Sequence, residues 1–268
     1  MLKKLKGLLR RDPEQFRIPR SVQEVIPIRT VWKSGIFLVG SNRYSRTWQF
    51  SDINYALAGE EDQKSMLLGY SGLLNLCDSN ASTKFSVVTR KLNRRDFEDY
   101  IMIPYANDGH DHYRREYNAM LLEKASHASG MIRDLYITVT VTRKSYKDAE
   151  SYFVRAGAEF TLALSRLGSR CTELDMMDRL RALHGFYRHG EEADFHFDPA
   201  LSMKLGHSFQ DYICPDSFEF DRDCFRMGDR YGRVLFLKDY ASYIKDSMIL
   251  ELTDLNRRMM LSIDMIPV

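Results

Sequence analysis

The hydrophobic and polar positions of the chain alternate between a period of two and a period near 3.6. Residues 134–144 (DLYITVTVTRK) alternate strictly between apolar and mostly hydroxyl-bearing side chains, which predicts a strand. Residues 145–168 instead carry apolar side chains at helical spacing. Ser145 and Asp148 have the spacing of a capping box, and Gly168 is a stop signal, so this segment is predicted to be a helix.

The same periodicities predict the other elements. Two strands, 35–40 and 43–55, are joined by a turn at Gly40, Ser41 and Asn42. They are followed by a helix at 60–77, a strand at 82–92 and a helix at 111–126, whose apolar side carries Tyr113, Tyr117, Met120 and Leu121 with Lys124. Beyond the strand and helix already described come a short strand at 169–175, a helix capped by Asp175 that runs to Tyr187, and a short helix between Asp198 and Gly206.

The order of these elements predicts an α+β fold. Strand, helix, strand, helix and strand over 82–174 are typical of a split βαβ (ferredoxin-like) unit, with helices packed on one face of a mixed sheet. Residues 232–266 resemble the first half of a second unit, and Val268 follows directly behind an apolar strand. We therefore expect the front part of a longer protein, divided into a tail (1–20), a hairpin and helix (21–81), a split βαβ domain (82–206) and an incomplete second unit (207–268).

Composition places the chain among ordinary globular proteins. It has 44% hydrophobic and 28% charged residues, and a formal net charge of +2. The charge is uneven, because residues 1–20 contain seven basic and two acidic side chains. Cys77, Cys171, Cys214 and Cys224 form no C-x-x-C pair, which favours reduced thiols. No apolar run approaches the ~20 residues of a membrane span, and the N-terminus lacks the apolar core of a secretory signal.

Catalytic motifs are not supported by the sequence. Residues 40–47 (GSNRYSRT) distantly resemble a phosphate-binding loop, but Ser45 and Arg46 replace the required glycine and lysine, and a β-prone segment follows. A hairpin turn is the favoured interpretation. Two histidine-containing groups lack zinc spacing and are interpreted as capping or surface residues: His110, Asp111, His112 and Glu116, and His184, His189, Glu191 and His196. The carboxylates of residues 216–223 are interpreted as a solvated acidic loop.

The basic N-terminus has two interpretations. It is a frayed tail, as many chain ends are, or an amphipathic segment that contacts an anionic membrane surface. In the second interpretation apolar and basic side chains share the contact with the acyl chains and the headgroups. These residues are Leu2, Lys3, Lys4, Leu5, Lys6, Leu8, Leu9, Arg10 and Arg11. The basic residues lack the interleaved aromatics that stack on bases, so direct binding of nucleic acid is not expected.

Long segments of the chain resemble the N-terminal region of conjugative-transfer ATPases, the TraE/TrsE-like members of the VirB class of type IV secretion motors. The resemblance runs from about Pro19 onward. It is carried by residues 19–40 (PRSVQEVIPIRTVWKSGIFLVG), 51–98, 113–125 (YRREYNAMLLEKA), 207–220 (HSFQDYICPDSFEF), 227–248 (MGDRYGRVLFLKDYASYIKDSM) and 255–268 (LNRRMMLSIDMIPV). These segments mark the family and do not themselves constitute an active site.

The resemblance implies a docking and assembly module at the cytoplasmic face of the membrane. In that family the ATP- and Mg²⁺-binding Walker motifs belong to a motor that follows, so no catalytic residue or cofactor is expected in this chain. The implied partners are inner-membrane channel subunits, with self-association through the full-length motor. Two other functions stay open from the sequence: a self-contained α+β enzyme acting on nucleotides or nucleic acid, and a DNA-binding accessory protein of the transfer apparatus.

Overall fold

The structure is a computed structural model. It describes residues 19–53, 55, 57–76, 78–91, 101–127, 131–233, 243, 245–253 and 257–265. The helices are α2 (Val22–Val25), α3 (Glu60–Leu74), α5 (Asp111–His127), α6 (Tyr146–Arg166), α7 (Met176–Tyr187), α8 (Pro199–Leu205), α9 (Gln210–Ile213) and α10 (Asp246–Thr253), with a short 3₁₀ turn at Glu192–Asp194. The strands are β1 (Ile28–Val31), β2 (Phe37–Val39), β3 (Arg43–Phe50), β4 (Ala81–Lys91), β5 (Met131–Thr142), β6 (Cys171–Glu173), β7 (Phe218–Phe220), β8 (Phe225–Met227), β9 (Arg230–Gly232) and β10 (Met259–Met265).

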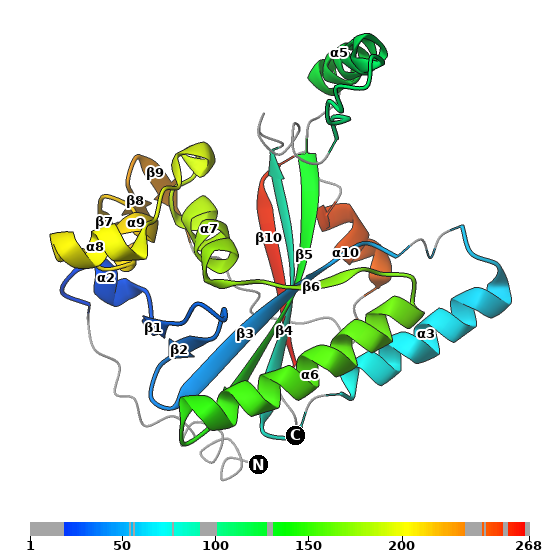
Figure 1. Cartoon of the computed structure of the whole chain (residues 1–268). Helices are drawn as coiled ribbons and strands as arrows, with labels where there is room; N and C mark the ends of the chain where they lie inside the picture. The colour runs from blue at the N-terminus through cyan, green and yellow to red at the C-terminus, as the bar shows by residue number, and fades with distance from the viewer. Residues whose placement is uncertain are drawn as a thin grey trace.

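The α+β class is confirmed, with a split βαβ unit at the centre of the molecule (Figure 1). The seven-stranded main sheet has the order β1-β2-β3-β5-β4-β10, and β6 pairs with the part of β3 that lies beyond β2. The ferredoxin-like order appears in β6-β3-β5-β4, where α3 connects β3 to β4 and α6 connects β5 to β6. The unit therefore begins at β3, one strand earlier than the sequence predicted.

Three details of the predicted sheet are corrected. Every pairing between described strands is antiparallel, where a mixed sheet was expected. Strands β4 and β5 pair directly along eleven residues, so the helix between them does not cross the sheet. Strand β10 pairs with β4 along seven residues and extends the main sheet, where a separate second unit was expected. Periodicity reveals each strand but does not specify its neighbour.

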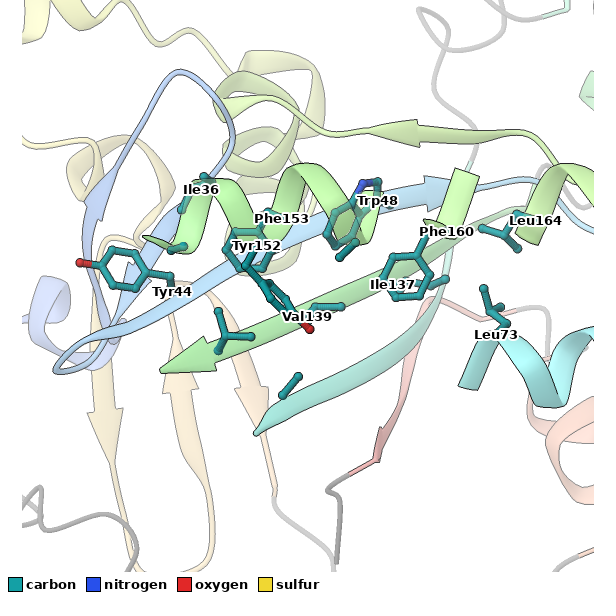
Figure 2. Packing of buried hydrophobic residues seen from close by; sticks show 14 residues of the cluster. Ile36, Tyr44, Trp48, Leu73, Ile137, Val139, Tyr152, Phe153, Phe160 and Leu164 are labelled. Carbon is teal, nitrogen blue, oxygen red and sulfur yellow. The ribbon is translucent and has the colours of Figure 1, made fainter. Parts of the chain in front are cut away.

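The main core lies between the sheet and the helices α3 and α6. Alternation along β5 points Ile137, Val139 and Val141 to this face, as predicted. Trp48 of β3 is fully buried between Phe153 and Phe160 of α6, with ring centroids 6.2 and 5.3 Å away (Figure 2). The predicted helix boundaries are confirmed: Ser145 accepts a hydrogen bond from the Asp148 amide at 3.3 Å, and Gly168 is left-handed with φ +80°.

A second core lies on the opposite face, over β1 and β2. Phe37 pairs with Ser45 while Leu38 pairs with Tyr44, so Phe37 and Leu38 point to opposite faces. Phe37 packs in a cluster with the buried residues Ile26, Ile28, Met176, Leu180, Phe195, Ile213 and Cys214. Helices therefore cover parts of both faces, where one covered face was expected. A three-stranded antiparallel sheet of β7, β8 and β9 follows this cluster in the chain.

Candidate functional site

The predicted membrane-contact residues, Leu2 to Arg11, lie outside the described residues, as do Cys77 and the end of the chain at Val268. Within the described ranges, no helix has the length and apolar character needed to cross a bilayer. The two interpretations of the N-terminus therefore stay predictions.

The turn at residues 40–42 is the hairpin turn that the sequence favoured. Gly40 and Asn42 adopt positive φ angles of 95° and 56°, and β2 pairs with β3 on its two sides. Arg43 begins a strand of eight residues, so no helix N-terminus follows the turn. The turn therefore lacks the element that would hold a phosphate in a phosphate-binding loop.

The histidine and cysteine side chains that the structure describes do not converge. No group of three or more potential ligands is placed to hold a metal ion in the part of the chain that the structure describes. His184 is buried against Phe195, whereas His110 and His112 flank the start of α5. The described cysteines, Cys171, Cys214 and Cys224, are free thiols. Burial raises the pKa of Cys214 to about 11, which keeps this thiol protonated and unreactive at neutral pH.

The structure brings forward a different surface, which we call the arm (residues 101–127). The arm comprises α5 and the segment before it, and it connects β4 to β5. Figure 1 shows α5 projecting beyond the ends of these strands, apart from the helices that pack on the sheet. The sequence predicted this helix but expected it to cover the sheet.

The inner side of α5 is held by polar contacts. The carboxamide of Asn118, which is only 2% exposed, accepts a hydrogen bond from the Ile103 amide and donates one to the Ile103 carbonyl, both at 2.9 Å. Asp111 accepts hydrogen bonds from the amides of Ala106 and Asn107 at 3.1 and 3.0 Å. Both amides precede α5, so these bonds tie the preceding segment to the helix and are not the helix cap that the sequence predicted. The segment 101–110 is therefore anchored along the polar side of the helix.

Arg114 adds an ionic clamp to this side. Its guanidinium donates to both carboxylate oxygens of Asp108 at 2.5 and 2.6 Å, and to Asp111 at 2.8 Å. The hydrogen bonds from Arg114 lower the pKa of Asp108 well below its usual range. Burial raises the pKa of Asp111, but hydrogen bonds from the two amides and from Arg114 outweigh it, so the net pKa is lowered. Both carboxylates are therefore ionised at neutral pH.

Beside this anchored side, α5 carries a stripe of exposed aromatic and apolar side chains. Tyr113, Tyr117 and Met120 recur at i, i+4 and i+7, and they are 63%, 48% and 37% exposed. Ile101, Ile103 and Tyr105 of the preceding segment are also exposed. This stripe was visible in the sequence. Its outward orientation was not, because periodicity identifies an apolar face without saying what covers it.

No family model matches the chain, and the search of curated proteins found no match.

Proposed function

We propose that this chain is the docking and assembly module of a conjugative DNA-transfer (type IV secretion) ATPase, and that the arm is its protein-contacting surface. The family assignment is supported by the resemblance of the segments between Pro19 and Val268. The docking role is supported by the exposed stripe of Tyr113, Tyr117 and Met120 on α5, which is the observation that carries the proposal. In this proposal the chain itself is not catalytic, and ATP and Mg²⁺ belong to the motor.

Physical chemistry favours a partner for the arm. The helix α5 has 17 residues, little more than the ~12–15 below which an isolated helix is marginal in water. Most helices gain their stability by burying an apolar face. In α5 the polar face is satisfied within the arm, and Tyr113, Tyr117 and Met120 are left exposed. Exposed aromatic residues and methionine are enriched at protein interfaces. A partner that buries this stripe would contribute about 25 cal/mol per Å² of apolar surface.

The partner we propose is an inner-membrane channel subunit of the transfer apparatus. Self-association is assigned to the full-length motor, so the arm stays available for the channel. The module would then lie peripherally at the inner face of the cell membrane, with residues 2–11 as a second contact to anionic lipid.

The experiment that tests docking uses the full-length ATPase in cells that carry the transfer apparatus. The arm variant combines Tyr113→Ser and Tyr117→Ser. Its matched control combines Tyr55→Ser and Val154→Ser, which change side chains of similar exposure, 49% and 60%, outside the arm. DNA transfer should fall about tenfold or more in the arm variant alone, as expected for losing hot-spot side chains. A photoreactive amino acid at position 117 should crosslink to a channel subunit.

The outcomes separate the alternatives. Unchanged transfer by the arm variant at normal protein levels would sink the docking role. Crosslinking of position 117 only to a second copy would replace the channel subunit with self-assembly. Flotation of the chain with anionic liposomes, with and without residues 1–11, tests the membrane contact separately, and equal flotation of the two forms would exclude it.

A further inference from the structure

A polar hollow of about 230 Å³ lies on the open face of the main sheet, opposite α6. It is lined by residues of β2, β3, β4, β5 and β10 and by one side chain of α7: Val39, Arg43, Ser45, Ser82, Lys84, Thr138, Thr140, Arg179 and Asp264. Three of these residues are cationic, four carry hydroxyl groups, and one is a carboxylate. The lining therefore has a formal charge of +2.

The register of the sheet brings the hydroxyl groups together. Ser45, Thr140 and Ser82 are direct partners across β3, β5 and β4. Thr138, Lys84 and Asp264 form the next row across β5, β4 and β10. Neighbouring strands are about 4.8 Å apart, so the side chains of a row lie next to one another on the same face of the sheet. The Thr138 hydroxyl is also hydrogen-bonded to that of Thr47 at 2.9 Å.

The side chain of Arg179, on α7, lines one side of the hollow, and its positive charge is not neutralised by a described carboxylate. It donates to the Gly35 and Ser45 carbonyl oxygens at 2.7 and 2.8 Å, and to the Ser45 hydroxyl at 3.0 Å. These acceptors are neutral, and among the described residues no carboxylate pairs with Arg179. Burial, with the nearby charge of Arg46, lowers the pKa of Arg179 to about 9, which still leaves it protonated at neutral pH. A negatively charged ligand in the hollow would therefore stabilise the charged form of Arg179.

Ser45 supplies a directed donor beside this cation. The side chain is 2% exposed, and its oxygen accepts from Arg179, so its own proton is available to a further acceptor. Lys84 is 3.5 Å from Asp264, and both side chains are about half exposed, so this ion pair leaves Lys84 free to contact a ligand as well.

We propose that this hollow binds a phosphate-class oxyanion. A tetrahedral oxyanion accepts several hydrogen bonds at once, which matches the convergence of Arg179, Lys84 and the hydroxyl groups of the sheet. The volume admits a phosphate group with a small organic substituent or ordered water. The site is separate from the arm, so it does not depend on the docking function proposed above.

The test is a titration of the intact chain with inorganic phosphate at constant ionic strength, followed by the NMR shifts of the Ser45, Thr138 and Thr140 amides. Lys84→Gln removes a cation and should weaken binding about tenfold. Asp264→Asn removes the opposing carboxylate of the same exposed pair and should strengthen binding. Lys64→Gln, which removes an exposed lysine from α3, is the matched control and should leave the affinity unchanged.

Parallel titrations with glycerol phosphate and with an oligothymidylate separate the sources of the anion. Tighter binding of glycerol phosphate would assign the site to phosphorylated small molecules, and tighter binding of inorganic phosphate would assign it to the free ion. A response equal to that of chloride, or one that neither Lys84→Gln nor Asp264→Asn changes, would overturn the proposal. So would a response to the oligothymidylate alone.

Discussion

Gly157 shows how a single residue sets the distance between α6 and the sheet. It lies where Trp48 and Glu173 meet, and a methyl group there would lie 3.1 Å from the indole nitrogen of Trp48 and still closer to the Glu173 carboxylate. That carboxylate cannot move freely, because it pairs with Arg46 at 2.5 Å and accepts from Trp48 at 3.3 Å. The glycine is therefore required by packing.

Replacing Gly157 with alanine should lower the free energy of unfolding by about 1–3 kcal/mol, the usual cost of overpacking. Gly72→Ala in α3 is the matched control, because nothing lies within 4 Å of the added methyl. It should raise stability by about 0.5–1 kcal/mol through helix propensity alone. Urea unfolding of the two variants measures both values, and a gain in both would show that α6 has room for the methyl.

His184 is a buried base with a pH-dependent cost. It is 3% exposed, and its Nδ1 has no hydrogen-bond partner among the described residues. Burial, together with the charge of Arg188, lowers its pKa, although nearby carboxylates partly oppose the shift. In the unfolded chain the pKa of this histidine is about 6.5. Between that value and its lower pKa in the folded protein, the unfolded state binds more protons at this site. Folding stability should therefore fall as the pH drops through this range.

The variant His184→Leu should flatten the pH dependence of stability between about pH 7 and 5, because it removes the group that the unfolded state protonates more readily. Urea unfolding at several pH values measures the slope. An unchanged slope would assign the acid sensitivity to other groups. His189 is one of these, since burial and Arg258 lower its pKa as well.

At the scale of elements, local pattern predicted most of the helices and strands but not their neighbours. The strict alternation of residues 134–144 and the capped stripe of 145–168 are properties of single segments, so they were readable. The pairing of β4 with β5 and the addition of β10 to β4 depend on contacts between distant residues, which one sequence does not reveal. The orientation of α5 and the convergence of Arg179 with Lys84 escaped prediction for the same reason.

The arm should behave as a local unit of stability. Its helix is tied to the segment 101–110 through Asn118, whereas the main core lies between the sheet and α6. Asn118→Ala leaves the amide and carbonyl of Ile103 without these partners, which costs about 1–3 kcal/mol where the groups stay buried. The substitution should therefore lower the free energy of opening the arm and leave the stability of the core unchanged.

Native-state hydrogen exchange checks this expectation. In Asn118→Ala the amides of α5 should exchange faster, while the amides of β5 and α6 keep the protection of the parent. Global unfolding by urea should change by less than about 0.5 kcal/mol. An equal loss of protection in β5 would show that the arm and the sheet unfold together, which would contradict the isolation seen in Figure 1.

At the scale of the whole molecule, two hydrophobic clusters lie on opposite faces of one sheet, and Arg179 joins the helix α7 of the second cluster to that sheet. The residue stands on α7, which belongs to the second cluster, and bonds to Gly35 before β2 and to Ser45 of β3. Its guanidinium also lies 3.9 Å from the centre of the Phe37 ring. Hydrogen bonds that involve a charged group contribute about 1.5–3 kcal/mol each, so this side chain holds α7 to the sheet.

Two spectroscopic signals of the chain can report this coupling. Its two tryptophans, Trp32 and Trp48, both pack in the main core, so their fluorescence reports that cluster, while circular dichroism reports helices of both. In the parent the two transitions should coincide.

In Arg179→Met the dichroism signal should begin to change before the fluorescence does, because α7 separates from the sheet first. Arg179→Lys should behave similarly, because an ammonium cannot reproduce the planar fork that reaches both carbonyls. Arg181→Met, on the exposed side of the same helix, is the control and should keep the transitions together. Coincident transitions in all three variants would mean that the two clusters are coupled by the sheet alone.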